Sequence, residues 1–188
     1  MGNIHAVIYR RVDAPARSVA SNVLVLLNPQ EASVVTNQVR KVENHIMKQR
    51  ILFLCTGNSA RSQIAEALLR QLAGDRFESF SAGTHPVGLN PGAVAAMKEV
   101  DIDISGQRSK SMIEFLGQPF DYVITVCDRA KESCPNWPQA SKVMHWSFED
   151  PAAAVGSAQD RRQAFREVRD QIADRISEFL CEDKHSSQ

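Results

Sequence analysis

The chain has 188 residues, of which 43% are hydrophobic and 23% charged, a size and composition that predict one globular domain with room for an appendage. Its 22 basic and 22 acidic residues balance, so composition gives no support for nucleic-acid binding. No apolar run approaches the ~18 residues that cross a bilayer, and Val23–Leu27 is too short for a signal-peptide core. We therefore expect no membrane association and a cytoplasmic location, where the four cysteines stay reduced.

Residues 1–49 differ in pattern from the rest of the chain. They contain a candidate short strand at Val23–Leu27 and a candidate amphipathic helix between Val35 and Ile46, without residues of evident chemistry. We interpret this segment as an N-terminal extension of unknown role, either poorly ordered or a wrongly assigned start ahead of Met47. A dimerising or docking helix is the alternative.

From residue 50 to residue 181, short apolar runs alternate with helical patterns, and residues 182–188 form a polar tail. This alternation predicts an α/β fold with an open, mainly parallel, four-stranded sheet and helices on both faces. The expected elements, in chain order, are strand 50–55, helix 61–73, strand 77–82, helix 90–99, a short helix near 109–116, strand 121–127, strand 142–146 and helix 159–180.

Several chemically distinctive residues fall at the carboxyl ends of these strands. In open parallel sheets, ligands bind beyond those ends. Cys55, Ser81, Cys127 and the loop after Trp146 all lie there. We therefore expect them to meet in one crevice.

The loop between the first strand and the first helix holds the strongest candidate site. A glycine-bearing loop that opens a helix presents converging N–H groups to a tetrahedral oxyanion. The same field lowers a cysteine pKa from ~8.5 to roughly 3.5–7.5, so Cys55 is the predicted nucleophile, with Ser62 donating to its sulfur. A buried cysteine beside an unrelated surface arginine is the alternative. The predicted oxyanion-binding residues are Thr56, Gly57, Asn58, Ser59, Ala60, Arg61 and Ser62.

Two further cysteines, Cys127 and Cys134, lie seven positions apart. On an intact helix their Cα atoms would be about 10.5 Å apart, whereas a disulfide tolerates only about 7 Å. A disulfide between them would therefore require the segment to unwind. Two unrelated buried thiols are the alternative. The last cysteine, Cys181, is interpreted as a spectator.

The remaining polar candidates are fewer. Asp150 precedes Pro151, which restricts its backbone and helps to direct its side chain. His85 and His145 are interpreted as structural, and Trp137 and Trp146 as core residues. No cysteine or histidine spacing favours a metal site.

Four segments carry a family resemblance that runs from about Arg50 to about Leu180. They are CTGNSARSQ, SAGTHPVGLNPGAVAAMKEVDIDIS, VITVCDRAKESCP and HWSFEDP. They resemble the low-molecular-weight tyrosine phosphatase fold family and, within it, the arsenate reductases that thioredoxin regenerates. Phosphatases of the family share the loop and the late Asp-Pro but lack the second and third cysteines at these places.

This resemblance implies arsenate reduction without a cofactor. Cys55 would attack arsenate held by Arg61, and Asp150 would protonate the departing oxygen. Cys127 and Cys134 would then carry a disulfide outward to thioredoxin, the implied partner. The alternatives are a low-molecular-weight phosphatase that hydrolyses phosphomonoesters and a noncatalytic oxyanion or redox sensor.

Thiol-coupled relatives also bind potassium near the loop through an asparagine, a glutamate, a serine and a later aspartate. Asn58, Glu66 and Ser81 match the first three, but the fourth position is Lys110 here. An ammonium puts one positive charge beside the same oxygens. We therefore expect Lys110 to replace the ion and the protein not to require potassium.

Overall fold

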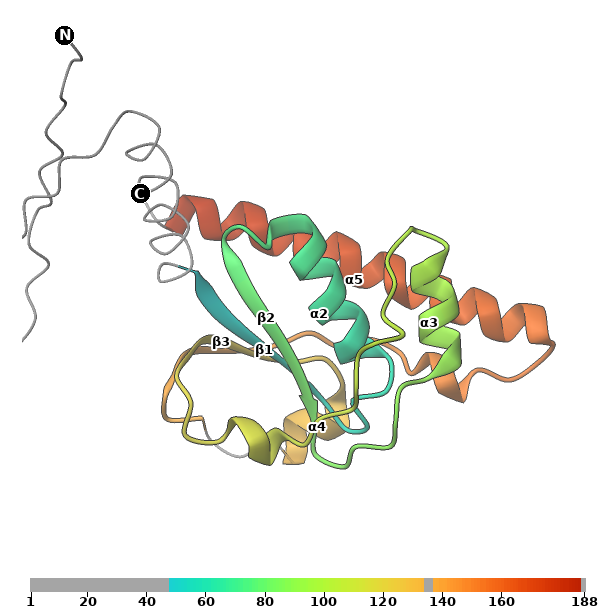
Figure 1. Ribbon diagram of the computed structural model, residues 1–188, viewed down its shortest axis with the longest axis horizontal. Coiled ribbons are helices and arrows are strands. Elements are labelled where there is room, and N and C mark those ends of the chain that lie inside the picture. Colours follow the sequence, from blue (N-terminus) through green and yellow to red (C-terminus); the bar gives the residue numbers. More distant parts are fainter. Residues whose placement is uncertain (1–47, 134–136, 187–188) are drawn as a thin grey trace, which may run out of the picture. The chain divides into compact units, whose positions relative to one another are not determined.

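The computed structural model describes residues 48–133 and 137–186 (Figure 1). The strand and the helix predicted within residues 1–49 lie outside the described residues, and so does Cys134. Within the described part, no helix is both long and apolar enough to span a membrane.

Four strands form one sheet in the spatial order β2-β1-β3-β4. All three neighbouring pairs are parallel, so the predicted four-stranded sheet is confirmed. Leu54, near the end of β1, pairs with Ala82 on one side and Thr125 on the other, which aligns the carboxyl ends of the three strands. The strands are β1 (Gln49–Cys55), β2 (Phe77–Gly83), β3 (Phe120–Thr125) and β4 (Ala140–His145).

Helices follow the strands at the four places where they were predicted, and two short ones, α4 and η2, were not predicted. The short helix predicted near 109–116 is the 3-10 helix η1, and the last helix continues past residue 180, so part of the predicted polar tail is helical. Asn90 begins α3 by accepting a hydrogen bond from the Gly92 N–H, and Pro91 occupies the first helical position. The helices are α2 (Arg61–Ala73), α3 (Pro91–Lys98), η1 (Met112–Phe115), α4 (Asp128–Ser133), η2 (Pro151–Ala153) and α5 (Ala158–Ser186).

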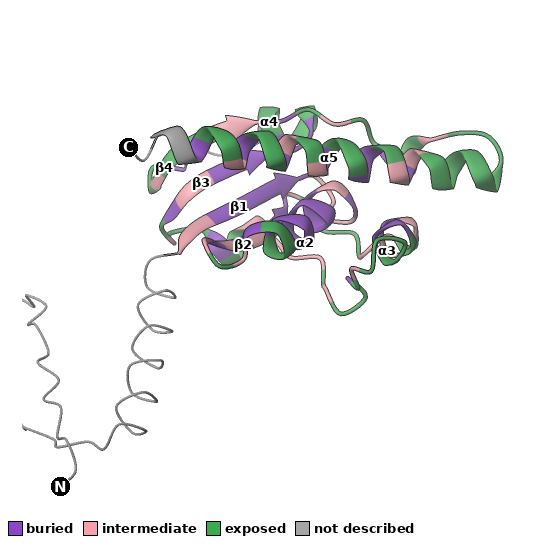
Figure 2. Ribbon diagram, turned by 90° about the horizontal axis from the view of Figure 1, so that it is seen from above, coloured by how far each residue is buried: buried purple, intermediate pink, exposed green. Residues whose placement is uncertain are grey.

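The two faces of the sheet carry separate apolar clusters because side chains alternate along each strand. Ile51 and Phe53 of β1 pack into the larger cluster, which α2, α3 and α5 complete. Leu52 and Leu54 face a smaller cluster, which η1 covers through Phe115. Figure 2 shows β1 buried along most of its length, as expected for a central strand. Helices on both faces, as predicted, therefore hold β1 rigid where it delivers the Cys55 loop.

Both tryptophans belong to this core, as predicted. Trp146 is 4% exposed and lies 5.8 Å from Phe53, ring centre to ring centre, in the larger cluster. Trp137 is 6% exposed and lies 6.2 Å from Phe120 in the smaller one. The aromatic side chains therefore stabilise the sheet from both faces.

Candidate active site

A cavity of about 660 Å³ opens at the carboxyl ends of β1 and β3. Cys55 and Cys127 both line it, together with the loop 147–150 that follows Trp146. The predicted convergence of these three segments is therefore present. The prediction was wrong for Ser81, which does not line the cavity and instead accepts a hydrogen bond from Asn58 of the loop.

The loop Cys55–Arg61 is held by hydrogen bonds from the segment that follows β2 to its carbonyl oxygens. The N–H groups of residues 84, 85, 87 and 90 donate to the carbonyls of Cys55, Thr56, Gly57 and Ser59 at 2.8–3.1 Å. In contrast, the N–H groups of Gly57, Ser59 and Ala60 donate to no other described residue. The loop therefore has free donors to offer an oxyanion, an arrangement that converging amides provide in anion-binding nests.

Three positions allow the sharp turn. Asn58 adopts φ 44°, in the left-handed region that asparagine tolerates better than most residues. Gly57 is required for space, since an added Cβ would lie 2.9 Å from a Val87 methyl. Gly83, at the end of β2, was not anticipated. A Cβ there would lie 2.6 Å from the Thr56 carbonyl oxygen, so only glycine lets the loop approach the strand.

Cys55 is 3% exposed, and its sulfur lies 2.9 Å from both the Asn58 N–H nitrogen and the Ser62 hydroxyl oxygen. Asn58 Nδ2 also donates to that hydroxyl at 2.9 Å, which leaves the hydroxyl hydrogen for the sulfur. The predicted contact between Ser62 and Cys55 is therefore present.

The predicted lowering of the Cys55 pKa is not found in the ligand-free site. Burial raises the pKa of the Cys55 thiol, and the hydrogen bonds from Ser62 and Asn58 oppose this rise without overcoming it. The nearby Cys127 thiol also raises the pKa. Sequence reasoning underestimated how completely the sheet and helices remove this sulfur from water, which disfavours the charged thiolate.

Arg61 and Asp150 meet at the wall of the cavity. Arg61 Nη2 lies 3.2 Å from Asp150 Oδ2, and Nη1 donates to the Phe148 carbonyl oxygen at 3.0 Å. The arginine is therefore held over the cavity by the same loop that carries the candidate acid. Asp150 Oδ1 accepts from the Ala152 N–H at 3.2 Å, which fixes the carboxylate at the start of η2.

Cys127 reaches the same cavity from β3. It is 3% exposed, and its sulfur lies 3.5 Å from the Thr56 hydroxyl oxygen within the Cys55 loop. The backbone N–H just before it, at Val126, donates to the Leu54 carbonyl at 2.8 Å, so adjacent strands fix both cysteines. The second thiol therefore borders the loop that holds the first.

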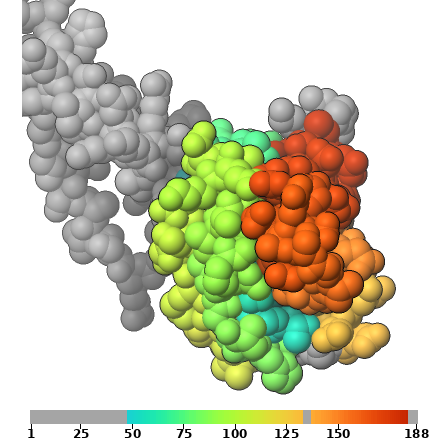
Figure 3. Space-filling view, turned by 90° about the vertical axis from the view of Figure 1, so that its right-hand side faces the viewer, coloured from blue at the N-terminus to red at the C-terminus, as the bar shows by residue number. Residues whose placement is uncertain are grey.

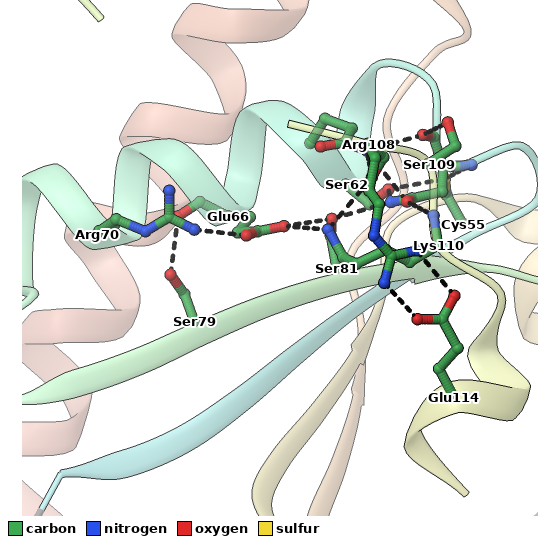
Figure 4. A network of polar contacts seen from close by, with 12 residues as sticks. Cys55, Ser62, Glu66, Arg70, Ser79, Ser81, Arg108, Ser109, Lys110 and Glu114 are labelled. Atoms are coloured by element: carbon green, nitrogen blue, oxygen red, sulfur yellow. Dashed lines mark hydrogen bonds and ion pairs between the residues drawn. The ribbon is translucent and has the colours of Figure 1, made fainter. Parts of the chain in front are cut away.

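Behind the loop, a network of polar side chains reaches Cys55 (Figure 4). Asn58 Nδ2 donates to the Ser81 hydroxyl at 2.9 Å, and this hydroxyl donates to Glu66 Oε2 at 2.5 Å. Lys110 Nζ donates to the same carboxylate oxygen at 3.1 Å, while Arg70 pairs with the other oxygen. Of the three residues that match the potassium site of the relatives, the ammonium thus contacts Glu66, which in turn accepts from Ser81.

His85 and His145 differ in their surroundings. His85 lines the cavity, but it is exposed and its ring contacts only Thr84 Oγ1, at 3.0 Å, among the described residues. His145, expected to be a packing residue, instead joins two polar groups. Its ring lies 2.8 Å from Thr125 Oγ1 and 3.0 Å from Asp128 Oδ1.

Several cavity residues were missed by sequence reasoning. They come from segment 87–91, which lies within the family resemblance but was given no role, and from Asp128, Arg129, Phe148 and Ala152. Gln63 was also missed; its amide donates to the Asn58 carbonyl and to the Arg108 carbonyl at 3.0 and 2.9 Å. Among the described residues, no group of three or more His, Cys, Asp or Glu side chains is arranged to hold a metal ion.

Residues 50–187 match the family described as low molecular weight phosphotyrosine protein phosphatase. An arsenate reductase from Oceanobacillus iheyensis is 46% identical over 132 residues, which cover 70% of this chain and 95% of that protein. A solved arsenate reductase in a phosphate-binding state is 31% identical, with a TM-score of 0.63, and the match covers 71% of this chain and 98% of that one.

A thioredoxin-dependent arsenate reductase from Corynebacterium glutamicum is 27% identical, with a TM-score of 0.57. The match covers 84% of this chain and 72% of that one. These similarities agree with a four-stranded parallel sheet whose first strand delivers a cysteine into an anion loop. The chain therefore belongs to the low molecular weight phosphotyrosine protein phosphatase family and groups within it with the arsenate reductases.

Proposed function

We propose that this protein reduces arsenate to arsenite through a relay of Cys55, Cys127 and Cys134 that a thioredoxin-type dithiol resets. The observation that carries the proposal is the position of Cys127, which shares the cavity with Cys55 and contacts the anion loop through Thr56 at 3.5 Å. Phosphoester hydrolysis needs one nucleophile and one acid, so it has no use for a second thiol there. Transfer of two electrons to a bound oxyanion, in contrast, needs a second thiol to form a disulfide with the first.

In the first step, arsenate enters as a dianion and accepts hydrogen bonds from the free loop amides and from Arg61. A guanidinium fork suits a tetrahedral oxyanion because two parallel N–H groups meet two oxygens. Arg61 must turn from Asp150 toward the ligand, which also releases the carboxyl group to serve as the acid. The proton of the Cys55 thiol passes to the Asp150 carboxylate, and the resulting thiolate attacks arsenic. Asp150 gives this proton to the departing hydroxyl, which leaves as water. The product is a covalent thiol–arsenate adduct.

In the second step, the Cys127 thiolate attacks the Cys55 sulfur. The sulfur–arsenic bond breaks, its electron pair stays on arsenic, and arsenite leaves. The two thiols have then lost two electrons and formed a Cys55–Cys127 disulfide. Thiol–disulfide exchange requires a thiolate that can reach the bond, and the shared cavity supports that access.

In the last steps, Cys134 attacks Cys127, which frees Cys55 and leaves a Cys127–Cys134 disulfide for an external dithiol to reduce. Asp128–Ser133 is helical in the structure. On an intact helix, residues seven apart are separated by about 10.5 Å, so α4 must unwind for this bond to form. The reset therefore includes a conformational change in addition to chemistry.

Phosphomonoester hydrolysis is the second candidate function. It is supported by the meeting of Cys55, Arg61 and Asp150 in one cavity, since these three groups are sufficient for attack, binding and leaving-group protonation. Phe148 also lines the cavity and offers an apolar contact to an organic phosphate. The two functions differ in their need for the second and third cysteines.

Substitution of each cysteine separates the two functions. We expect Cys127→Ser and Cys134→Ser to abolish steady-state arsenate reduction driven by thioredoxin, thioredoxin reductase and NADPH, while Cys55→Ser abolishes all activity. Cys181→Ser is the matched control, because Cys181 is an exposed thiol on α5 outside the cavity. Undiminished arsenate turnover in both variants, with strong p-nitrophenyl phosphate hydrolysis, would reject the relay and favour the phosphatase. Replacing thioredoxin by glutathione with glutaredoxin in the same assay tests the electron donor.

A further inference from the structure

A second cavity, of about 390 Å³, adjoins the catalytic one. Asn90 and Ala152 line both, so the two hollows meet at the start of α3 and at η2. The rest of the second wall comes from Gly92, Pro151 and the beginning of α5, which packs beside α3 on the face shown in Figure 3. Its ionisable residues are Arg161 and Arg162.

The two cavities differ in the sign of their charge. The catalytic cavity is lined by two arginines and by three carboxylates, namely Asp128, Glu149 and Asp150. These carboxylates oppose the approach of a dianion. The second cavity is lined by two arginines and by no carboxylate. A cleft with one sign of charge concentrates ligands of the opposite sign.

Both arginine side chains are exposed, so a ligand in the second cavity can reach them. Arg162 makes no hydrogen bond or ion pair with any other described residue, and it is exposed. Arg161 Nη1 donates to the Gly156 carbonyl at 2.6 Å, and its charge is partly offset by the neighbouring Asp160 carboxylate, which does not line the cavity. The Asp160 carboxylate accepts a hydrogen bond from the Ser157 N–H at 2.7 Å, and the Asp160 N–H donates to the Ser157 hydroxyl at 3.2 Å. Two cations in the first turns of a helix also oppose the helix dipole, so the dipole does not explain their position in α5.

We propose that this second cavity is an oxyanion-capture site that delivers substrate to the catalytic loop. Arg161 and Arg162 attract the tetrahedral dianion, and the ion then passes Asn90 and Ala152 into the catalytic cavity. The substrate class rests on the proposed arsenate reduction. The site acts on binding alone and takes no part in the chemistry at Cys55.

The test is the double variant Arg161→Gln/Arg162→Gln, measured beside Lys48→Gln/Lys142→Gln. The control pair removes the same charge at positions outside both cavities. Arsenate kcat and KM are measured at ionic strengths from about 20 mM to about 500 mM, over which screening shortens the reach of charge several-fold. Inorganic phosphate protection of Cys55 against iodoacetamide gives a second readout that needs no turnover, so failure of the proposed function is distinguishable from failure of the capture site.

At low ionic strength we expect the arginine variant to raise KM and the phosphate concentration for half-protection about fivefold, with kcat unchanged. The difference should disappear at high salt, and the control pair should match the wild type. Arg162→Gln alone, which removes no contact between described residues, should raise KM in part. Arg161→Lys/Arg162→Lys, which keeps both charges, should have the wild-type KM. Three results would overturn the proposal: an equal rise of KM in Lys48→Gln/Lys142→Gln, a rise of KM that does not depend on salt, or a KM in Arg161→Lys/Arg162→Lys that stays as high as in the glutamine variant.

Discussion

Replacing Lys110 by methionine tests whether the ammonium serves as a built-in cation. Lys110 Nζ lies 3.1 Å from Glu66 Oε2, and the two side chains are only 13% and 8% exposed. Methionine keeps most of the side-chain volume and removes the charge. Glu66 would then keep Arg70 and Ser81 as partners, but Oε2 would lose the one cation that it contacts among the described residues.

The size of the effect follows from burial. Breaking a buried ion pair costs about 3–5 kcal/mol when the remaining charge has no other partner. Because Arg70 still neutralises Glu66, we expect a smaller loss, about 2 kcal/mol. For a chain of this length that loss lowers Tm by about 4–8 °C. Arg108→Met is the matched control, since Arg108 and Glu114 form an exposed pair whose loss costs at most about 1 kcal/mol.

Thermal unfolding is measured by calorimetry in sodium and in potassium buffers of equal ionic strength. We expect the wild type to melt at the same temperature in both, and Lys110→Ala, which leaves space at Glu66, to regain stability in potassium but not in sodium. A wild-type Tm that rises with potassium would refute the idea that Lys110 replaces the ion. So would a Lys110→Met variant as stable as the Arg108→Met control.

Three further predictions concern the loop and the far end of the sheet. Ser62→Ala removes a hydrogen bond that lowers the Cys55 pKa, so its pH profile of iodoacetamide alkylation should move to higher pH; an unchanged profile would contradict this. Gly83→Ala places a Cβ 2.6 Å from a loop carbonyl and should weaken phosphate protection at least about tenfold, whereas Gly106→Ala, with nothing within 4 Å, should behave like the wild type; equal protection in both would argue against the close approach. Burial and a neighbouring carboxylate raise the pKa of Tyr122 to about 12, so the folded state keeps a proton that the unfolded state loses near pH ~10, and stability should fall between about pH 10 and about pH 12. Tyr122→Phe should remove the absorbance change at 295 nm near pH 12, and a transition that persists would reject the assignment.

The sequence was sufficient to predict the sheet and the loop because both follow from local patterns. The run Ile51–Leu54 alternates between two buried faces, and the loop after it carries its own turn residues. Asn58 was expected to take an unusual backbone angle and does, with φ 44°. Element boundaries were less accurate at the last helix, where Ala158–Ser186 runs beyond the predicted end, since nothing in its polar last residues stops a helix.

What could not be predicted depends on contacts between distant segments. The bonds from segment 84–90 to the loop carbonyls are made by backbone atoms, which leave no trace in residue type. The need for glycine at position 83 arises from Thr56 across the sheet edge. The rise in the Cys55 pKa likewise reflects burial of its side chain, which depends on how distant segments pack around the end of β1. Arg161 and Arg162 belong to no recognisable sequence motif. Their position beside the catalytic cavity follows from the packing of α5 on α3.

Mass mapping of disulfides after a single turnover tests the relay most directly. Reduced Cys134→Ser protein is mixed with one equivalent of arsenate, quenched in acid, alkylated and digested. We expect one arsenite per chain and a peptide pair joined through Cys55 and Cys127, whereas the wild type should yield a Cys127–Cys134 link and an alkylatable Cys55. Arsenite release that leaves Cys127 fully alkylatable would contradict the proposed transfer of electrons between these two sulfurs.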